Sequence, residues 1–372
     1  MYSSIRIQGY RGLKSFQMRG LGRVNLLVGT NNCGKTSILE SIQLLRSTGN
    51  PYVLSSIAGR RGEWGYGSDR DSRSQLGSGP EPLDLSHLFA DRQVHRAINI
   101  EADRIADDAD DNWSDQVTVS VDDRHVIQQH APDAEPFEDN QESLILRVKW
   151  SDAEVAYKAT ISEEGFLLGS RPPPRTQLGF SQPVPFVRTS GMTAADVVRT
   201  FSKFVLTPKH EAIKQALRII EPTIEDLVPI ADGLTRYSHS RDAPGGVVLR
   251  LHGVENRVPI GSMGDGMWRM LGLALSIASA DGGVLLVDEI DTGLHYSVME
   301  DMWRMLSNAA AARSVQLFAT THNRDCYESL AAIAMSADGG VTIQRIDRDR
   351  GEAARFSREA IVAAAERGLE VR

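Results

Sequence analysis

The residues with the clearest chemical potential form a glycine-bounded loop near the beginning of the 372-residue chain. Residues 29–36 read Gly-Thr-Asn-Asn-Cys-Gly-Lys-Thr, which fits the phosphate-binding pattern G-x-x-x-x-G-K-[ST]. Glycines let backbone N–H groups surround phosphate oxygens, and a following helix adds the positive end of its dipole. We expect Lys35 to bridge the β- and γ-phosphates of ATP and Thr36 to offer its hydroxyl to Mg²⁺. The predicted nucleotide-binding residues of this loop are Gly29, Asn31, Asn32, Cys33, Gly34, Lys35, Thr36 and Ser37.

Two adjacent carboxylates further along the chain supply the second half of such a site. Asp288 and Glu289 directly follow the apolar run 284–287. At the carboxyl end of a parallel strand, one carboxylate can bind a metal while its neighbour activates water. We therefore expect Asp288 to bind Mg²⁺ together with Thr36, and Glu289 to act as the general base. Paired acids in this position can also cap a helix, but the phosphate loop in the same chain favours catalysis.

Two further segments carry candidate residues. His322 follows the apolar run 315–320, one strand and helix after Glu289, and joins Lys35 and Glu289 as a catalytic candidate, although a lone histidine is more often structural. The run 261–266, Gly-Ser-Met-Gly-Asp-Gly, opens a predicted helix. Ser262 and Gly264 in this run are nucleotide-binding candidates, and the alternative is an ordinary glycine turn with a serine cap.

Strands and helices must alternate to position these groups. The sequence predicts strands at 4–8 and 24–28, the phosphate loop, and a helix at 36–46. The same alternation returns after residue 246 as strands and helices at 247–251, 264–278, 284–288, 298–312, 315–320 and 341–346. Continuous apolar strands indicate a buried, mainly parallel sheet. The predicted fold class is therefore α/β, a P-loop NTPase.

The middle of the chain has a different pattern. Residues 51–82 are rich in Gly, Ser and Arg and predict a loop-rich insertion. Alternating stretches predict an antiparallel β lobe at 97–102, 117–121, 144–150 and 155–161, and helices are expected at 194–204 and 210–220. The expected units are the first part of the ATPase core (1–50), the β lobe insertion (51–190), the helical insertion (191–245) and the second part of the core (246–372).

Composition limits the possible surroundings and partners. No apolar run approaches the roughly 20 residues of a membrane helix, and the amino terminus lacks the pattern of a signal peptide. Only two cysteines, Cys33 and Cys326, occur, so we expect a cytoplasmic protein without a disulfide framework. The net charge is -8, and residues 101–142 hold fourteen Asp and Glu against two Arg, an acidic cluster expected on exposed turns. DNA binding is therefore predicted to be weak at most.

The motifs together resemble a known family. The runs 262–269, 288–297 and 320–322 are similar to the ABC-type ATPase domain of OLD-family and RecF-like proteins. The resemblance implies a head-to-tail homodimer with two bound ATPs, in which Ser262 and Gly264 reach the partner's γ-phosphate and residues 293–295 form a crossing loop. It also implies that His322 contacts the γ-phosphate. Stand-alone relatives commonly pair with a separate effector in phage defence, so the resemblance implies this role, with a nuclease or toxin as the effector.

Several features depart from that pattern or leave alternatives open. The transporter signature Leu-Ser-Gly-Gly-Gln is absent, Gln93 is a candidate for the glutamine loop, and Arg11 is either an arginine near the nucleotide or a surface residue. Residues 347–349, Asp-Arg-Asp, are expected to form a turn rather than a nuclease site, and His125 and His130 lack zinc-site spacing. The alternatives to effector control are a RecF-like DNA-repair clamp and a slowly hydrolysing scaffold that sequesters a toxin.

Overall fold

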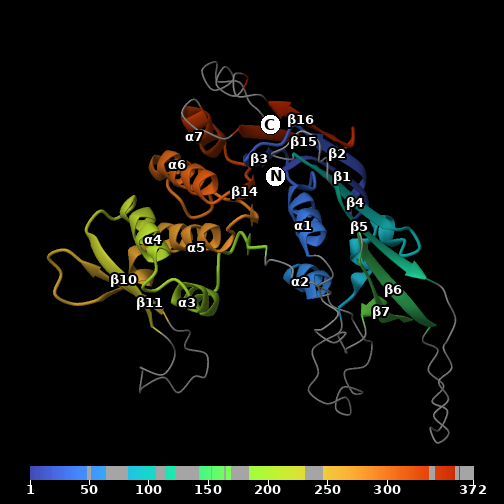
Figure 1. The fold of residues 1–372 in the computed structure, drawn as a ribbon, viewed down its shortest axis with the longest axis horizontal. Helices are drawn as coiled ribbons and strands as arrows, with labels where there is room; N and C mark the ends of the chain where they lie inside the picture. The colour runs from blue at the N-terminus through green and yellow to red at the C-terminus, as the bar shows by residue number, and fades with distance from the viewer. Residues whose placement is uncertain are drawn as a thin grey trace, which may run out of the picture.

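A 13-stranded sheet runs through the molecule (Figure 1). The computed structural model describes residues 1–47, 52–63, 83–105, 114–122, 142–151, 153–162, 165–168, 184–230, 246–334, 340–356 and 360. The strands of the large sheet are β1 (Tyr2–Tyr10), β2 (Leu13–Arg19), β3 (Val24–Val28), β4 (Ile98–Arg104), β5 (Ser114–Asp122), β6 (Glu142–Trp150), β7 (Ala153–Ser162), β8 (Gly165–Leu168), β9 (Phe186–Val187), β13 (Val284–Val287), β14 (Gln316–Thr320), β15 (Val341–Asp347) and β16 (Glu352–Phe356). Their order is β8-β7-β6-β5-β4-β1-β2-β16-β15-β3-β14-β13-β9.

One half of this sheet is the parallel core that the sequence predicts. Strands β9, β13, β14, β3 and β15 pair in parallel. Every residue of β3, β13 and β14 is buried, because side chains on both faces of these strands enter a hydrophobic core. Leu286 and Phe318 pack on the face of helices α1 (Lys35–Arg46) and α2 (Tyr52–Arg60), whereas Leu285 and Leu317 pack towards α5 (Asp265–Ser279), α6 (Tyr296–Ala312) and α7 (Arg324–Ala334).

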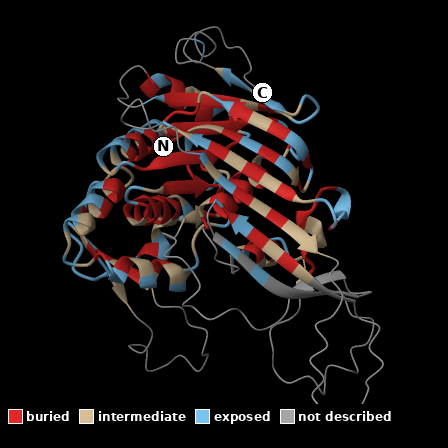
Figure 2. Ribbon diagram, turned by 45° about the vertical axis from the view of Figure 1, so that its right-hand side comes forward, coloured by how far each residue is buried: buried red, intermediate tan, exposed pale blue. Residues whose placement is uncertain are grey.

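The other half is the predicted antiparallel lobe, and it continues the same sheet. Strand β1 pairs with β2 on one side and with β4 on the other, and β4 to β8 follow in antiparallel order. Buried and more accessible positions alternate along β1, β4, β5 and the described positions of β6, which Figure 2 shows as bands of changing colour. One face of the lobe therefore covers the core and the other faces outward.

A helical layer and a small sheet lie beside the parallel core. Helices α3 (Ala194–Ser202) and α4 (Pro208–Arg218) confirm the two helices predicted in this region. Thr193 caps α3 by accepting a hydrogen bond from the backbone N–H of Asp196. A second, three-stranded sheet comprises β10 (Ile224–Ile230), β11 (Gly246–Leu251) and β12 (Val258–Pro259). Together these elements support the helix α5, which leads towards the predicted site.

Some expectations need correction. Residues 52–60, predicted as loop, form helix α2, because Val53, Leu54 and Ile57 have helical spacing and pack into the core. Strand β16 follows the strand at 341–347 that was expected to be the last. The described acids of the cluster at 101–142, such as Glu101 and Asp115, lie on strands rather than turns.

Other predictions fall outside the described residues. These concern His125, His130, most of the acidic cluster, residues 64–82 and the tail beyond residue 360. No helix in the described part of the chain is long and apolar enough to cross a membrane.

Candidate functional site

The phosphate loop lies between the buried strand β3 and helix α1, as predicted. Asn32 and Gly34 have positive φ angles of 63° and 101°, which lets the loop turn back before the helix begins. A side chain at Gly29 would place its Cβ 2.9 Å from the sulfur of Cys33, so only glycine fits this first position. The Lys35 ammonium donates to the carbonyl oxygens of Gly29 (2.7 Å) and Thr30 (3.0 Å). Its charge therefore lies across the mouth of the loop.

Thr36 and Asp288, which were predicted to share a metal ion, are in direct contact. The hydroxyl Oγ1 of Thr36 lies 3.0 Å from Oδ2 and 3.2 Å from Oδ1 of Asp288. Thr36 opens α1 and Asp288 follows β13, so two distant segments meet at one edge of the sheet. A hydroxyl and a carboxylate are hard oxygen donors of the kind that Mg²⁺ prefers. The residues present therefore fit this ion.

Thr320 joins the two carboxylates at this edge. Its hydroxyl donates to Oδ1 of Asp288 (2.7 Å) and accepts a hydrogen bond from the backbone N–H of Glu289 (2.8 Å). Thr320 is fully buried at the end of β14, so this hydroxyl has little freedom to move. We call Thr36, Asp288, Glu289 and Thr320 the metal edge. Sequence reasoning missed Thr320, although it stands two residues before the singled-out His322.

Glu289 has an unusual backbone and lies close to His322. Its φ angle is 45°, in the left-handed region that non-glycine residues seldom adopt. This conformation is fixed by the hydrogen bond from its N–H and by the next residue, because Ile290 N–H donates to the Thr320 carbonyl at 3.0 Å. Oε1 of Glu289 lies 3.5 Å from Nδ1 of His322, and both side chains are partly exposed. The predicted base and histidine thus share one accessible space.

A buried arginine, Arg269, holds the backbone of both acids from behind. Its guanidinium donates to the carbonyl oxygens of Asp288 (2.9 Å), Glu289 (2.6 Å) and Arg188 (2.6 Å). Burial lowers the pKa of Arg269, and the nearby carboxylates of Asp291, Asp288 and Glu289 oppose this shift. Arg269 belongs to α5 and is only 4% exposed. A charged residue on the buried side of an apolar helix is the signal that could have revealed it.

Ser262 and Gly264 lie on a different, exposed surface. Gly264 has a φ angle of 89° at the start of α5, and the hydroxyl of Ser262 donates to the carbonyl of Pro259. A Cβ on Gly266 would lie 3.1 Å from the carbonyl oxygen of Gly293, so the start of α5 packs against the predicted crossing loop. We call Ser262, Gly264, Gly293 and Tyr296 the glycine face. In the described structure, neither Ser262 nor Gly264 hydrogen-bonds to the phosphate loop of its own chain.

The structure gives the partners of Arg11 and the position of Gln93, and their suggested roles near the nucleotide stay predictions. The side chain of Arg11 is only 9% exposed and forms an ion pair with Glu40 at 3.0 Å and another with Glu63, so it is not a surface arginine. Gln93 is exposed at the end of a short 3₁₀ helix, and its backbone N–H donates to Ala90. The residues next to the metal edge at the end of β9 are instead Arg188, Thr189 and Ser190.

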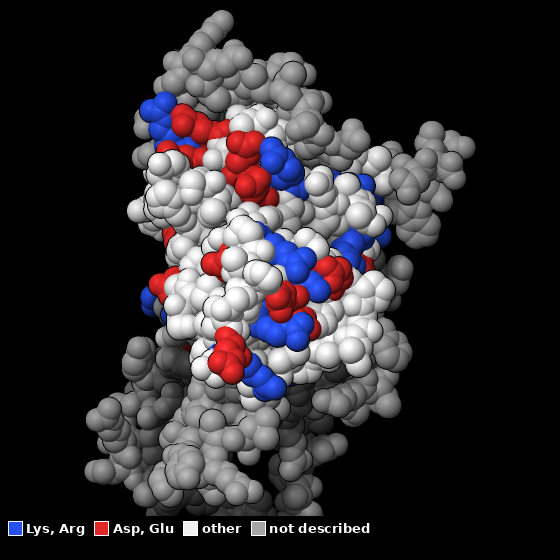
Figure 3. Space-filling model, turned by 90° about the vertical axis from the view of Figure 1, so that its left-hand side faces the viewer, with Lys and Arg blue, Asp and Glu red and all other residues white. Residues whose placement is uncertain are grey.

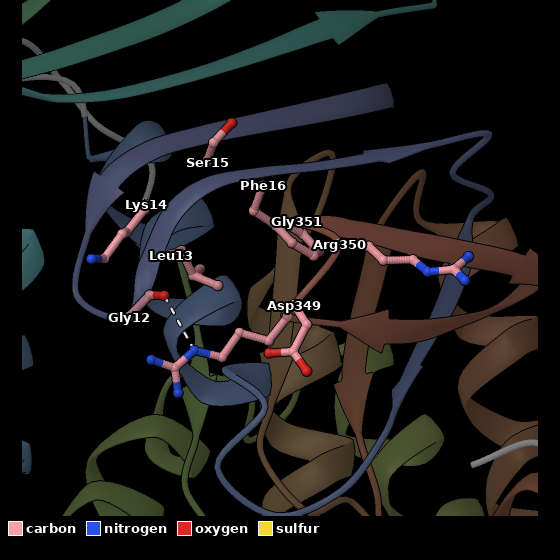
Figure 4. Close-up of a pocket in the computed structure, with 9 residues that line it drawn as sticks. Gly12, Leu13, Lys14, Ser15, Phe16, Asp349, Arg350 and Gly351 are labelled. Atoms are coloured by element: carbon pink, nitrogen blue, oxygen red, sulfur yellow. Dashed lines mark hydrogen bonds between the residues drawn. The ribbon is translucent and has the colours of Figure 1, made fainter.

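Two cavities adjoin the phosphate loop. One of about 520 Å³ lies between the turn at Gly12 and the β15–β16 turn, which face each other in Figure 4. Arg348 donates across it to the carbonyl of Gly12 (3.3 Å) and reaches Asn32 of the phosphate loop (3.4 Å). The turn predicted for residues 347–349 is confirmed, since Arg348 and Asp349 lie in it. The other cavity, of about 370 Å³, is lined by Thr36, Asp288 and arginines.

The parallel core, the phosphate loop and the paired acids define an ATPase of the ABC type with a P-loop. A protein-family comparison then gives the narrower class, because residues 24–324 match the family described as "AAA domain, putative AbiEii toxin, Type IV TA system". The chain belongs to this family. The finer resemblance to OLD-family and RecF-like proteins stays a prediction.

Individual proteins are similar to the chain at lower identity. A Helicobacter pylori protein named ATP/GTP phosphatase is 20% identical over 362 residues, which cover 91% of this chain and 90% of that protein. Among solved structures, the SMC head domain from Thermotoga maritima has a TM-score of 0.44 at 13% identity, covering 96% of this chain and 98% of that one. An SMC head bound to the C-terminal winged-helix domain of ScpA has a TM-score of 0.48 at 13% identity, covering 96% and 97%.

Proposed function

We propose that the chain works as an ATP-gated homodimer that hydrolyses ATP with Glu289 as the general base and so controls a separate effector protein. The observation that carries the catalytic part is the metal edge. Thr36, Asp288 and Thr320 are joined by hydrogen bonds of 2.7–3.2 Å, and Thr320 also fixes the backbone of Glu289. Such fixed polar groups stabilise charge in a reaction without having to reorganise.

Each residue of the proposed site has a distinct task. Lys35 would leave its carbonyl partners and donate to the β- and γ-phosphates, while loop N–H groups hold the remaining oxygens. Mg²⁺ on Thr36 and Asp288 would neutralise charge on the phosphate oxygens when it is bound. Glu289 would accept a proton from water as that water attacks the terminal phosphorus. His322, 3.5 Å from Glu289, would orient this carboxylate and contact the γ-phosphate.

The cavity between the Gly12 turn and the β15–β16 turn is our proposed place for the base and sugar of the nucleotide. It lies beside the phosphate loop on the side of β15, across β3 from the metal edge. The Arg348 guanidinium at its wall offers a flat cation on which a purine could stack. A purine held by stacking and backbone contacts need not be adenine, and the H. pylori relative is named for both ATP and GTP.

Dimerisation is supported by the glycine face. Tyr296 is 64% exposed there, and Ser262 and Gly264 are exposed without a bond to their own phosphate loop. A second copy placed head to tail would bring these groups to the nucleotide of the first, as the family resemblance implies. The family description names a toxin–antitoxin system. This supports an effector protein, either a nuclease or a toxin, as the partner of the dimer.

DNA has a minor place in this proposal. On the face that carries α4 and α6, Lys and Arg alternate with Asp and Glu without forming a basic stripe (Figure 3). Arg304, for example, pairs with Glu300 and Asp301 on α6. Phosphate backbones bind best to unneutralised positive charge, so we expect weak DNA binding by the closed dimer.

The test compares wild-type protein with Glu289→Gln. We expect the variant to bind ATP with unchanged affinity, to lose about 10²–10⁴-fold in turnover, and to accumulate as an ATP-dependent dimer in light scattering. Glu300→Gln, an exposed change on α6, is the matched control. Normal hydrolysis by Glu289→Gln would exclude it as the base, and a monomer under all nucleotide conditions would exclude the gated dimer.

The same variant tests DNA and the effector. Binding to duplex DNA should require ATP and fall steeply between two salt concentrations. Tight binding without nucleotide would favour a DNA-repair clamp instead. If the dimer controls an effector, a partner protein that co-purifies with it should be bound to a different extent with ATP and without nucleotide.

A further inference from the structure

The cavity beside the metal edge carries an excess of positive charge. Its volume is about 370 Å³, and Thr36 and Asp288 form the wall nearest the phosphate loop. Three arginines complete it, Arg60 and Arg61 from the end of α2 and Arg188 from the end of β9. Because Arg188 follows the strand that pairs with β13, it is carried to the same sheet edge as Asp288.

The carboxylates of this cavity do not neutralise all three arginines. Glu40 accepts a hydrogen bond from Arg61 at 2.8 Å, but it also pairs with Arg11 at 3.0 Å. Asp288 is the carboxylate predicted to bind Mg²⁺. Arg60 donates to the neutral side chain of Gln43 and lies over the ring of Phe186 at 4.2 Å.

Arg188 is the least committed of the three. Its carbonyl accepts from Arg269, but its guanidinium makes no hydrogen bond or ion pair with another residue in the described ranges. Burial lowers the pKa of Arg60, Glu40 opposes this shift, and the positive charges of Arg188 and Arg61 add to it. Cations crowded in a half-buried cavity indicate a site for an anion.

We propose that this cavity binds a phosphate group, with Arg188 as its main donor, and receives inorganic phosphate after ATP is cleaved. This inference rests on the proposed hydrolysis. In that reaction the bond between the bridging oxygen and the γ-phosphorus breaks, a bond from the water oxygen to phosphorus forms, and Glu289 takes the proton. ADP leaves with the bridging oxygen, and the phosphate is released beside Thr36.

The position of the cavity supports the release of phosphate into it. Thr36 and Asp288 belong both to the metal edge and to the wall of the cavity, so the terminal phosphate has a direct path into it. The proposed base and sugar cavity lies on the other side of β3. Phosphate can therefore leave without ADP leaving first. The same donors could alternatively hold the terminal phosphoryl group of intact ATP.

The decisive experiment measures binding rather than turnover, so it remains valid if Glu289 proves not to be the base. Full-length protein with Mg²⁺ and saturating ADP is titrated with radiolabelled inorganic phosphate in equilibrium dialysis. ATP and ADP affinities are measured separately with fluorescent analogues. The variants are Arg188→Gln and the control Arg199→Gln, an exposed arginine of α3 whose side chain is 73% accessible.

We expect Arg188→Gln to weaken phosphate binding at least tenfold and to leave ADP affinity and the thermal unfolding midpoint unchanged. Loss of a charge-assisted bond accounts for a change of this size. A second outcome is that Arg188→Gln binds phosphate and ADP as wild type does but binds ATP more weakly. The cavity would then hold the terminal phosphoryl group of intact ATP, and the proposed release of phosphate into it would be wrong. Phosphate, ATP and ADP affinities all equal to those of Arg199→Gln would overturn the proposal.

Discussion

The metal edge and the glycine face belong to the same ATPase, yet they are built in opposite ways. At the metal edge, side chains from α1, β13 and β14 are joined by hydrogen bonds, and Thr320 is fully buried. The glycine face is exposed, and its Ser262 and Gly264 make no hydrogen bond to their own phosphate loop in the described structure. The difference teaches that the metal edge is held together within one chain, whereas the role that we propose for the glycine face depends on a second copy.

The largest effect that separates the two regions is expected from Lys35→Ala. Removing the ammonium takes away charge-assisted bonds to two phosphates, and we expect ATP affinity to fall about 100-fold, or about 3 kcal/mol. Titration with a fluorescent ATP analogue measures this. Lys203→Ala, an exposed lysine at the end of α3, is the matched control. Unchanged ATP affinity in Lys35→Ala would break the comparison, because the phosphate loop would then not hold the nucleotide.

Ser262→Arg should have the next largest effect and act only through the second copy. The exposed position accepts the larger side chain without disturbing the core, so we expect the monomer to bind ATP within about threefold of wild type. Hydrolysis should fall about 10- to 100-fold, because a donor to the partner's nucleotide is lost and the dimer is obstructed. Steady-state rates measured over a range of protein concentrations test this. Full activity would show that the glycine face takes no part in hydrolysis.

Two neighbouring threonines allow a finer test of the metal edge. Thr320 bonds to Asp288 at 2.7 Å, and Thr321 bonds in the same manner to Asp291 at 2.6 Å. Both are fully buried, so Thr320→Val and Thr321→Val should each reduce the free energy of unfolding by about 1–3 kcal/mol. In addition to this loss of stability, only Thr320→Val is expected to lower kcat, by about tenfold. Equal kcat values in the two variants would make Thr320 merely structural.

The smallest effect is expected at Cys33, despite its place inside the phosphate loop. Its side chain is 7% exposed and packs beside Gly29, so maleimide should label the native protein far more slowly than the unfolded protein. Cys33→Ser should keep hydrolysis within about twofold of wild type. Rapid labelling that ATP prevents would instead place the thiol at the nucleotide, as expected for one of the predicted nucleotide-binding residues.

The local motifs were readable from sequence, whereas the contacts between distant segments were not. The phosphate loop at Gly29–Thr36 and the acid pair Asp288–Glu289 can each be recognised from a few neighbouring residues. The structure places Thr36 in contact with Asp288, as expected. Thr320 and Arg269 escaped notice because their hydrogen bonds to the two acids join residues 19 to 32 positions apart. Helix α2 was missed since the Gly, Ser and Arg content of 51–82 outweighed the helical spacing of its apolar residues.

Sheet continuity was also beyond local reasoning. The antiparallel order of the β lobe could be predicted from alternation, but the pairing of β1 with β4 joins segments more than 90 residues apart. Such pairing depends on which edge of the β1–β2 hairpin is free to pair with another strand. No short sequence pattern predicts this edge.

We expect Arg269 to let helix α5 connect the glycine face with the catalytic acids. The start of this helix lies at the glycine face, and its buried arginine bonds to the backbone of both Asp288 and Glu289. A shift of α5 would therefore change the free energy of the backbone conformation at Asp288 and Glu289. A change at these two residues would change the free energy of the helix position by the same amount. Thermodynamic coupling is reciprocal, so a nucleotide that binds more tightly when α5 is displaced must favour the corresponding form of the acids. In a dimer, each chain would then register the state of the other's nucleotide through a single side chain.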